Sequence, residues 1–247
     1  QKYMILFSKS QIKLITSLQQ KKYRNKLGLF VAEGPKVINE LITAKLQLHS
    51  LYSTVDRLFE DQSVQIVSEK ELSKITALKN ANNSLAVFKI PDKKPYVENE
   101  ITVVLDAIQD PGNLGTIIRL CDWFDVKNLI CSLNTVDCFN PKVIQATMGS
   151  IVRVNIVYTA IEEFILERNS PVYIGAMNGT NIYKENLPDN AIIVVGNEAN
   201  GVSTKIMNLV SNKVAIPQFG INKETESLNV ATATAILLSE FKRITVS

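Results

Sequence analysis

The chain has 247 residues, of which 46% are hydrophobic and 21% are charged, so it can form one large folded domain or two ordinary ones. Its net charge of +3 is divided unevenly, since residues 1–99 carry 16 basic and 9 acidic side chains and residues 100–247 carry 11 and 15. This division is consistent with a polyanion bound by the first half, and equally with a basic face that only contacts water.

Other features of the composition exclude several classes of protein. No run of about 18 apolar residues is present, so the sequence predicts no membrane-spanning helix. The three cysteines, Cys121, Cys131 and Cys138, form no CxxC pair, which disfavours both a disulfide scaffold and a zinc site. Unpaired cysteines are typical of reducing compartments. We therefore expect a cytoplasmic protein with no bound metal.

Short helices and strands alternate before residue 91. The pattern predicts, in chain order, a helix over 8–20, a strand over 27–34, a helix over 35–44, strands over 46–53 and 63–68, a helix over 68–78 and a strand over 84–90. Ser68 and Glu71 have the spacing of a capping box, which marks a helix start. Residues 91–100, PDKKPYVENE, contain two prolines and five charges and are interpreted as a linker.

After the linker the alternation becomes more regular. It predicts strands over 101–108, 126–132, 152–158, 171–177, 191–196 and 213–217, and helices over 113–124, 141–150, 202–210 and 227–243. Strands that alternate with helices in this way are typical of α/β domains with a mostly parallel sheet. We therefore predict a small α/β domain over residues 1–95, followed by a larger α/β domain over residues 96–247.

Three polar loops follow predicted strands of the second half, at residues 106–119, 194–203 and 216–229. Ligands bind beyond the carboxyl ends of the strands in such sheets, so the three loops predict one composite site. The sequence has no GxxxxGK[ST], GxGxxG or GxSxG motif, and its one histidine, His49, lies in the first half. Nucleoside triphosphate sites, conventional dinucleotide sites and Ser-His-Asp hydrolase sites are therefore disfavoured.

Taken in order, the three loops resemble the three motifs of the SpoU (TrmH-type) branch of the SPOUT methyltransferases. The residues that carry the resemblance are Asn113, Gly115 and Arg119 for motif 1, Gly196, Asn197, Glu198 and Gly201 for motif 2, and Ile216, Pro217, Ser227, Leu228, Asn229 and Val230 for motif 3. The resemblance covers residues 101–247. In the first half, residues 29–42, LFVAEGPKVINELI, are similar to the substrate-binding domain often fused ahead of this family's catalytic domain.

The resemblance implies an S-adenosylmethionine-dependent RNA ribose 2′-O-methyltransferase. It also implies that residues 96–247 form a trefoil-knotted catalytic domain, that this domain forms a homodimer, and that residues 1–95 bind the RNA substrate. Ribosomal RNA is favoured over tRNA because the first domain is similar to those of rRNA-modifying relatives. The alternatives are a non-catalytic RNA-binding protein with the same fold and an unrelated nucleotide-binding enzyme.

The resemblance assigns catalytic roles to Arg119, Asn113, Glu198, Ser227 and Asn229. The arginine that matches Arg119 is proposed in the family as the base for the 2′-hydroxyl, yet a free guanidinium keeps its proton up to about pH 12 or higher. Arg119 is therefore also expected to clamp the target phosphate, with Glu198 orienting it or Asn113. By residue type alone, Asn113 and Ser227 can simply cap helices, and Glu198 can be a solvated loop residue.

The resemblance also supplies candidate binding residues. Those for the cofactor are Gly196, Asn197, Gly201, Ile216, Leu228 and Asn229, with Ile221 as a further apolar contact. The two glycines are equally explained as turn residues. The best candidates for RNA phosphate contacts are Lys13, Lys21, Lys22, Arg24 and Lys26, among which Tyr23 can stack on a base. The small residues 232–235 are expected at the dimer interface.

Overall fold

The computed structural model describes residues 7–59, 62–79, 81–220 and 227–243, and the chain divides into two compact units. Unit 1 comprises Gln1–Asp92 with Asp137–Val152, and unit 2 comprises Lys93–Val136 with Arg153–Ser247. Residues 137–152 lie in the sequence range expected for the second domain, but they pack with the first unit. The domain boundary after residue 95 remains a prediction.

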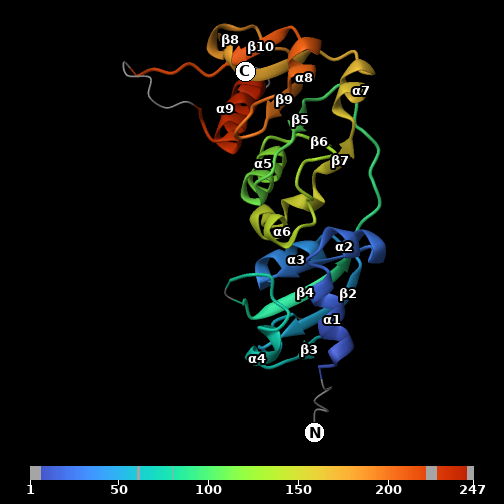
Figure 1. The fold of residues 1–247 in the computed structure, drawn as a ribbon. Helices are drawn as coiled ribbons and strands as arrows, with labels where there is room; N and C mark the ends of the chain where they lie inside the picture. The colour runs from blue at the N-terminus through green and yellow to red at the C-terminus, as the bar shows by residue number, and fades with distance from the viewer. Residues whose placement is uncertain (1–6, 60–61, 80, 221–226, 244–247) are drawn as a thin grey trace. The chain divides into compact units, whose positions relative to one another are not determined.

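Unit 1 is built on a mixed sheet whose strand order, within the described residues, is β1-β4-β2-β3 (Figure 1). Its strands are β1 (Leu29–Glu33), β2 (Leu48–Ser53), β3 (Gln65–Ile66) and β4 (Ser84–Lys89). Strand β4 is antiparallel to β1 and β2, and β2 is parallel to β3. The helices are α1 (Lys9–Ser17), α2 (Lys21–Leu27), α3 (Pro35–Thr43), α4 (Glu69–Leu72), α6 (Pro141–Thr147) and the 3-10 helix η1 (Ser150–Val152).

Alternating side chains of β1 and β4 fill both faces of this sheet, because successive residues of a strand point in opposite directions. Val31 and Val87 join the apolar cluster that α1 and α4 complete. The intervening Phe30 and Phe88 stack at 5.8 Å, and Phe30 also meets Phe139, just before α6, at 5.0 Å. A segment from the middle of the chain therefore closes the core of unit 1.

Local sequence signals fix where two helices of unit 1 begin. Ser8 and Ser68 each form a complete capping box, at α1 and α4. The helix predicted over 68–78 is wrong in length, since α4 ends at Leu72. The chain turns away there, and Thr76 and Ala77 instead donate hydrogen bonds to the buried Glu33 carboxylate.

Unit 2 contains a six-stranded sheet, within the described residues, in the order β10-β8-β9-β5-β6-β7. All neighbouring strands are parallel, which confirms the predicted α/β class. The strands are β5 (Thr102–Asp106), β6 (Asn128–Ser132), β7 (Asn155–Thr159), β8 (Val172–Asn181), β9 (Ile192–Gly196) and β10 (Asn212–Ala215). The helices are α5 (Pro111–Trp123), α7 (Ile161–Leu166), α8 (Thr204–Leu209), α9 (Val230–Arg243) and the 3-10 helix η2 (Ile182–Lys184).

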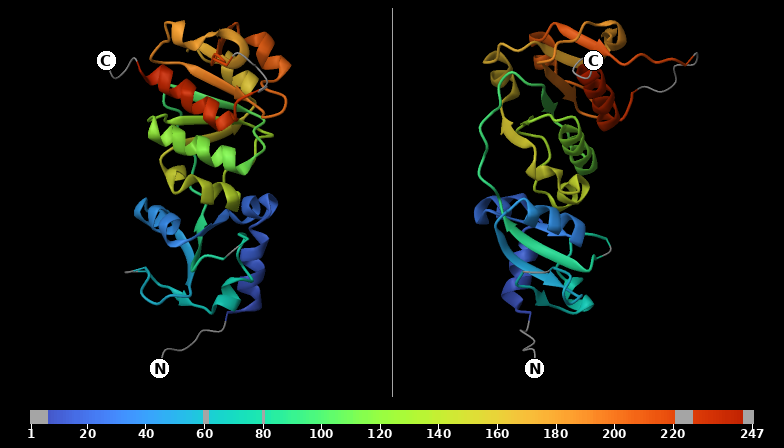
Figure 2. Two further views of the ribbon diagram at one scale, coloured as in Figure 1. Left: turned by 90° about the vertical axis from the view of Figure 1, so that its left-hand side faces the viewer. Right: turned by 180° about the vertical axis from the view of Figure 1, so that it is seen from behind.

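Helices cover both faces of the parallel sheet. Side chains of α7 and α8 share an apolar cluster with Val104 and Val194 from the central strands. Helices α5 and α9 pack against each other on the opposite face (Figures 1 and 2). Strands β5 and β9 are buried along their whole length, and their last residues, Asp106 and Gly196, pair in register. The loops after these two strands therefore start side by side.

Part of the predicted linker is fixed to unit 2. The Asn128 side chain donates to the Val97 carbonyl (2.8 Å) and accepts from the Val97 N–H (3.1 Å), and Asn155 donates to the Pro95 carbonyl (3.1 Å).

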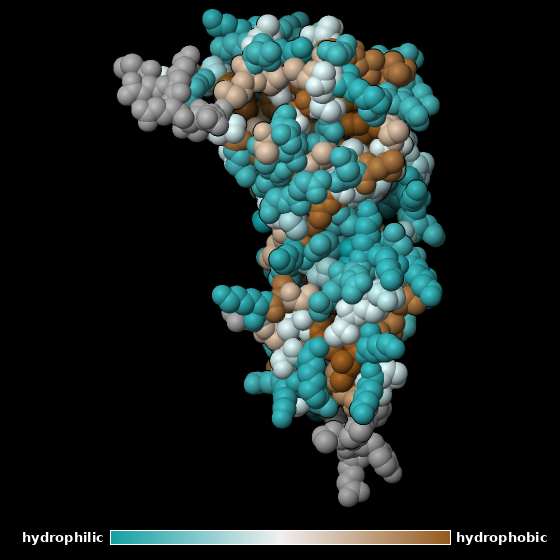
Figure 3. All heavy atoms as spheres, viewed as in Figure 1, coloured by the Kyte–Doolittle hydropathy of each residue, from teal (hydrophilic) through white to brown (hydrophobic). Residues whose placement is uncertain are grey.

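On the face seen in Figure 3, hydrophilic residues cover most of the described surface and apolar ones form separate spots. No described helix has the length and apolar character needed to cross a membrane.

Candidate active site

The first loop of the site joins β5 to α5. Asp106 is 7% exposed, and its Oδ2 accepts the backbone N–H of Ser203 at 2.8 Å. Asp110 caps α5, since its Oδ1 accepts the backbone N–H of Asn113 at 2.7 Å. The alternative in which Asn113 caps this helix is therefore wrong. With the cap supplied by Asp110, the Asn113 side chain can bond elsewhere.

The second loop is a tight turn after β9. A Cβ on Gly196 would lie 2.1 Å from the backbone of Gly201, so only glycine fits there. Asn197 and Gly201 exchange two backbone hydrogen bonds of 2.9 Å, and Gly201 has a positive φ of 66°. The Asn197 amide donates to the Ala107 carbonyl at 2.7 Å, while its oxygen accepts two N–H groups of the turn. Asn197 thus joins the second loop to the first.

The third loop leads into α9. The Oδ1 atom of Asn229 accepts the backbone N–H groups of Ala231 (2.9 Å) and Thr232 (3.2 Å), in the manner of a helix cap. Ser227 is exposed and makes no hydrogen bond with a described residue, so the alternative in which it caps this helix finds no support among the described contacts. Ile221, expected as a cofactor contact, lies outside the described residues.

Three predicted residues, one from each loop, form a single chain of hydrogen bonds. Asn229 Nδ2 donates to Asn113 Oδ1 at 2.9 Å, and Asn113 Nδ2 donates to Glu198 Oε1 at 2.9 Å. Because Asn229 Oδ1 already accepts from α9, its NH₂ group must point toward Asn113. This fixes the orientation of the Asn113 amide and directs its NH₂ group to the carboxylate. The other oxygen of the exposed Glu198 carboxylate stays accessible.

Arg119 is not joined to this chain. It lies on α5, six residues after Asn113, and is exposed. Within the described residues its guanidinium makes no hydrogen bond and no ion pair, so the expectation that Glu198 orients Arg119 is not met here, whereas contact of Glu198 with Asn113 is. An unpaired guanidinium keeps all five donors available for a phosphate or a ribose.

The second and third loops also carry exposed backbone and apolar side chains. Leu228 is 48% exposed, and Ile216 is half-buried after β10. A Cβ at Gly201 would meet no heavy atom within 4 Å, so this side of the turn is open. Sequence reasoning missed Phe219, which is 83% exposed and has its ring centroid 6.4 Å from that of Tyr183. The sequence did offer one indication of Phe219, because this residue lies within the third loop, at residues 216–229. Open backbone and exposed apolar groups fit an adenosyl group.

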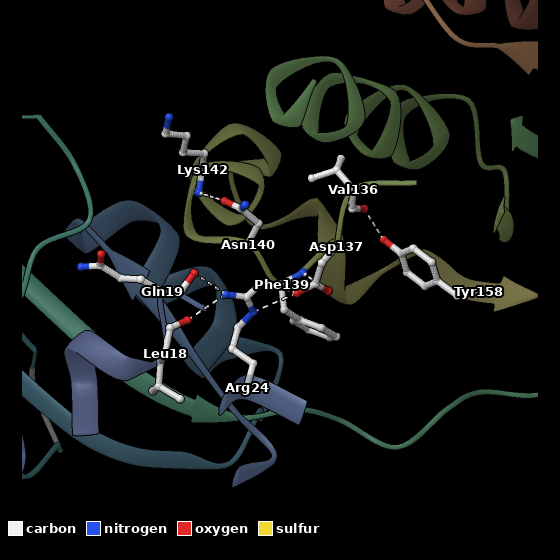
Figure 4. Close-up of polar contacts among 9 residues, drawn as sticks. All are labelled: Leu18, Gln19, Arg24, Val136, Asp137, Phe139, Asn140, Lys142 and Tyr158. Carbon is white, nitrogen blue, oxygen red and sulfur yellow. Dashed lines mark hydrogen bonds and ion pairs between the residues drawn. The ribbon is translucent and has the colours of Figure 1, made fainter. Parts of the chain in front are cut away.

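The predicted RNA contacts in unit 1 divide into two kinds. Four of them are exposed on α1 and α2: Lys13, Lys21, Lys22 and Lys26. Lys22 lies over the ring of Tyr23, with its Nζ 4.9 Å from the centroid. Arg24 is a wrong prediction, because it is 2% exposed and forms an ion pair with Asp137 (Figure 4). A guanidinium buried in this way cannot reach a phosphate.

The cysteines are all buried in the described structure. Burial raises the pKa of the Cys121 thiol far above its ordinary value, so it stays protonated and unreactive. Among the described residues, His, Cys, Asp and Glu form no cluster suited to a metal ion.

Comparisons with known proteins match both halves of the chain. Residues 100–239 match the SpoU rRNA Methylase family, and residues 9–86 match the MRM3-like substrate binding domain. The chain is 29% identical over 231 residues to the 23S rRNA (guanosine(2553)-2′-O)-methyltransferase RlmP of Bacillus subtilis, covering 90% of this chain and 91% of that one.

Solved structures also resemble nearly the whole chain. One is a putative RNA methyltransferase of the TrmH family from Porphyromonas gingivalis, with 33% identity, a TM-score of 0.86, and coverage of 97% of this chain and 99% of that one. Another is an AdoMet-bound rRNA methyltransferase from Sinorhizobium meliloti, with 29% identity, a TM-score of 0.82, and coverage of 96% and 95%. With its family match over more than half its length, the chain belongs to the SpoU rRNA methylase family.

Proposed function

We propose that this protein transfers a methyl group from S-adenosylmethionine to a ribose 2′-hydroxyl of ribosomal RNA. The observation that carries the proposal is the hydrogen-bond chain from Asn229 through Asn113 to Glu198, which unites the three motif loops at one edge of the sheet. Two relatives support the proposal. The Bacillus subtilis relative is named as a 23S rRNA 2′-O-methyltransferase, and the Sinorhizobium meliloti structure contains AdoMet.

The proposed cofactor site uses the second and third loops. Gly196 and Gly201 would let the backbone approach the adenosyl group, and Ile216 and Leu228 would supply apolar walls. When bound, S-adenosylmethionine supplies a methyl group activated by its sulfonium. The protein then has to hold the RNA ribose in line with that methyl group and accept the hydroxyl proton.

The polar residues fit this positioning task. We assign Arg119 mainly to the target phosphate, since its guanidinium has no ion pair with a described residue and matches a phosphate through two parallel hydrogen bonds. The second carboxylate oxygen of Glu198 would accept a hydrogen bond from the substrate, and the bond from Asn113 to Oε1 supports this role by holding the carboxylate. Proton removal by Arg119 remains the second role, and the dependence of the single-turnover rate on pH separates the two.

The remaining expectations form part of the same proposal. Unit 1 would bind RNA through its exposed lysines, and rRNA is favoured over tRNA by the substrate-binding match at residues 9–86. A homodimer through unit 2 is supported by Trp123, which is 84% exposed at the end of α5. We also propose a trefoil knot in unit 2, from family membership, and a cytoplasmic location, from three cysteines that form no CxxC pair.

The test combines a binding assay with a transfer assay. Isothermal titration should detect S-adenosylmethionine and S-adenosylhomocysteine. Labelled methyl groups should appear on deproteinised rRNA from cells that lack the gene, at a 2′-oxygen that is unmodified in those cells. The absence of binding heat at high micromolar cofactor, with and without RNA, would contradict the proposed cofactor. Transfer to tRNA alone would contradict the proposed substrate.

A further inference from the structure

Arg24 is the feature of unit 1 that the proposed function leaves unexplained. It is fully buried, yet its guanidinium has a partner for each nitrogen (Figure 4). Nη1 donates to the carbonyls of Leu18 (2.8 Å) and Gln19 (3.0 Å), and Nε donates to Asp137 Oδ2 at 2.9 Å, where Nη2 also bonds. The rigid fork of an arginine therefore joins the turn after α1 to the first residue of segment 137–152.

Segment 137–152 is held on unit 1 at several points besides this ion pair. Asp137 Oδ1 accepts the backbone N–H of Phe139 at 3.2 Å, and the Phe139 ring lies 5.0 Å from that of Phe30. Near the far end, a Cβ on Gly149 would lie 2.5 Å from Cβ of Glu40, so the backbone approaches α3 as closely as it can. The position of Asp137 is therefore set by unit 1.

The residues just before Asp137 are bonded to the first loop of the candidate active site. Val136 donates its N–H to the Ile108 carbonyl at 2.8 Å, and Gln109 donates to the Asn134 carbonyl at 2.6 Å. The Val136 carbonyl is itself fixed by the hydroxyl of Tyr158 at 2.6 Å (Figure 4). Residues 134–136 thus hold residues 108–109, which immediately precede the Asp110 cap.

A second bond holds the start of the same loop. The backbone N–H of Ala107 donates to Ser132 Oγ at 2.8 Å, and Ala107 has a positive φ of 59°, a conformation that costs a non-glycine residue energy. A strained loop keeps its shape only while its surroundings enforce it. The enforcing residues, 132–136, run directly into Asp137.

We infer that Arg24 is a positioning residue for Asn113. The Arg24–Asp137 ion pair fixes Asp137, which follows residues 132–136 directly in the chain. Residues 132–136 in turn bond the loop 107–110, and that loop sets where Asp110 places the start of α5 and its Asn113 side chain. The inference rests on the proposed function for its catalytic readout. Helix α2 thereby has two roles, since Lys22 and Lys26 on its surface face solvent while Arg24 reaches inward.

Stability alone is a weak explanation for this pair. Removing two charges from water is costly, and well-packed apolar residues of similar size are often as good or better for folding. An apolar pair cannot supply directional hydrogen bonds. The guanidinium of Arg24 does, because it bonds Asp137 and the carbonyls of Leu18 and Gln19 at the same time. A role in stability and a role in positioning therefore predict different results for a variant with an apolar pair at these two sites. Such a variant restores packing but not the directional hydrogen bonds.

The experiment compares four variants of the full-length protein: Arg24→Lys, Arg24→Met, Asp137→Asn and the double variant Arg24→Met/Asp137→Leu. Lys36→Met, which removes an exposed cation from α3 in the same unit, is the matched control. Three quantities are measured for each: the single-turnover methylation rate at saturating rRNA and S-adenosylmethionine, the cofactor Kd, and amide hydrogen exchange at residues 107–113. Thermal unfolding identifies variants that do not fold.

We expect the rate at saturation to fall about 10-fold to 100-fold in every folded ion-pair variant, because a displacement of about 1 Å at a reacting group has this effect. The cofactor Kd should change less than about twofold, exchange at 107–113 should rise, and Lys36→Met should match wild type. Wild-type rates and exchange in the double variant, or in Arg24→Lys and Asp137→Asn, overturn the inference. If wild type itself transfers no methyl group, the proposed function fails, and the exchange measurement alone decides whether Arg24 positions the loop.

Discussion

The two units place their functional residues by different means. Unit 2 has a parallel sheet, so the loops after β5 and β9 emerge at one edge, and Asp106 and Gly196 start them side by side. Unit 1 has a mixed sheet, and the lysines proposed to contact RNA instead lie along α1 and α2. A parallel sheet gathers short polar side chains from distant parts of the sequence into one site, whereas a helix surface presents charge without enclosing anything.

The strongest test of this contrast removes the cation that unit 2 presents beside its site. Arg119→Ala should lower the single-turnover rate about 10²-fold to 10⁴-fold, because the side chain acts on the substrate. Its fold and cofactor affinity should persist, since Arg119 has no bond to a described residue. A wild-type rate for Arg119→Ala would remove the residue from the mechanism and leave Glu198 as the next candidate.

The Arg119→Lys variant distinguishes the two roles of this cation. A phosphate clamp predicts partial activity at neutral pH, a weak response to pH and poorer RNA binding, because the bidentate fork is lost. A base predicts recovery of activity at high pH, since an amine loses its proton far more easily than a guanidinium. We expect the clamp pattern, measured as single-turnover rate against pH.

The second test concerns the backbone that builds the site of unit 2. Gly196→Ala should destabilise the protein by about 3 kcal/mol and abolish cofactor binding, because the added Cβ would overlap the backbone of Gly201. Gly201→Ala is the matched control, since its Cβ meets open space and only the positive φ is strained, at about 1–2 kcal/mol. Urea unfolding compares the stability of the two variants, and titration calorimetry measures cofactor binding by Gly196→Ala. Equal losses of stability in the two variants would contradict the close approach at Gly196.

The third test addresses the lysines of unit 1. The triple variant Lys13→Gln, Lys22→Gln and Lys26→Gln should weaken RNA binding and lower the slope of log K against log salt by about 2, at roughly 0.7 per single-strand phosphate contact. The rate at saturating RNA should stay near wild type. Lys205→Gln, at an 82% exposed site in unit 2, is the control. A triple variant with the wild-type salt slope would place the RNA elsewhere.

The smallest expected effect is a pH dependence that belongs to unit 1. Burial raises the pKa of Glu33 above its ordinary value of 4.5, against the opposing hydrogen bonds from Thr76 and Ala77. The folded protein then holds this proton more tightly than the unfolded chain, so stability due to Glu33 is greatest below pH 4.5 and decreases as the pH rises through the folded pKa. Urea unfolding from pH 4 to 7 should show this decrease in wild type and not in Glu33→Gln. Parallel curves would contradict it.

Sequence reasoning predicted the features that depend on near neighbours. The capping box at Ser68 was read correctly from a spacing of three residues, and the α/β class from alternating elements. Sequence reasoning failed where a residue far away in the chain determines the environment of a side chain. Arg24 looked like one more surface cation because its partner, Asp137, lies 113 residues away. Short elements such as α2 and α7 were missed, because six or seven residues hold too few turns to show a helical period.

The candidate site was recognised only partly from residue types. Asn113, Glu198 and Asn229 were named through the family resemblance, and the structure brings them together. Their mutual order could not be predicted, since it depends on Asp110 rather than Asn113 capping α5. Ser227 was placed at a helix start that Asn229 occupies instead.

The hydrogen bonds from α9 to Glu198 all run in one direction, and this has a consequence for how the protein can change over generations. The two amides must keep the same sense, because reversing one would set two acceptors or two donors face to face. A substitution at Asn229, Asn113 or Glu198 would leave a donor or an acceptor of its neighbour without its partner. We therefore expect changes at these three positions to be coupled, so that a second substitution has to restore the sequence of donors and acceptors.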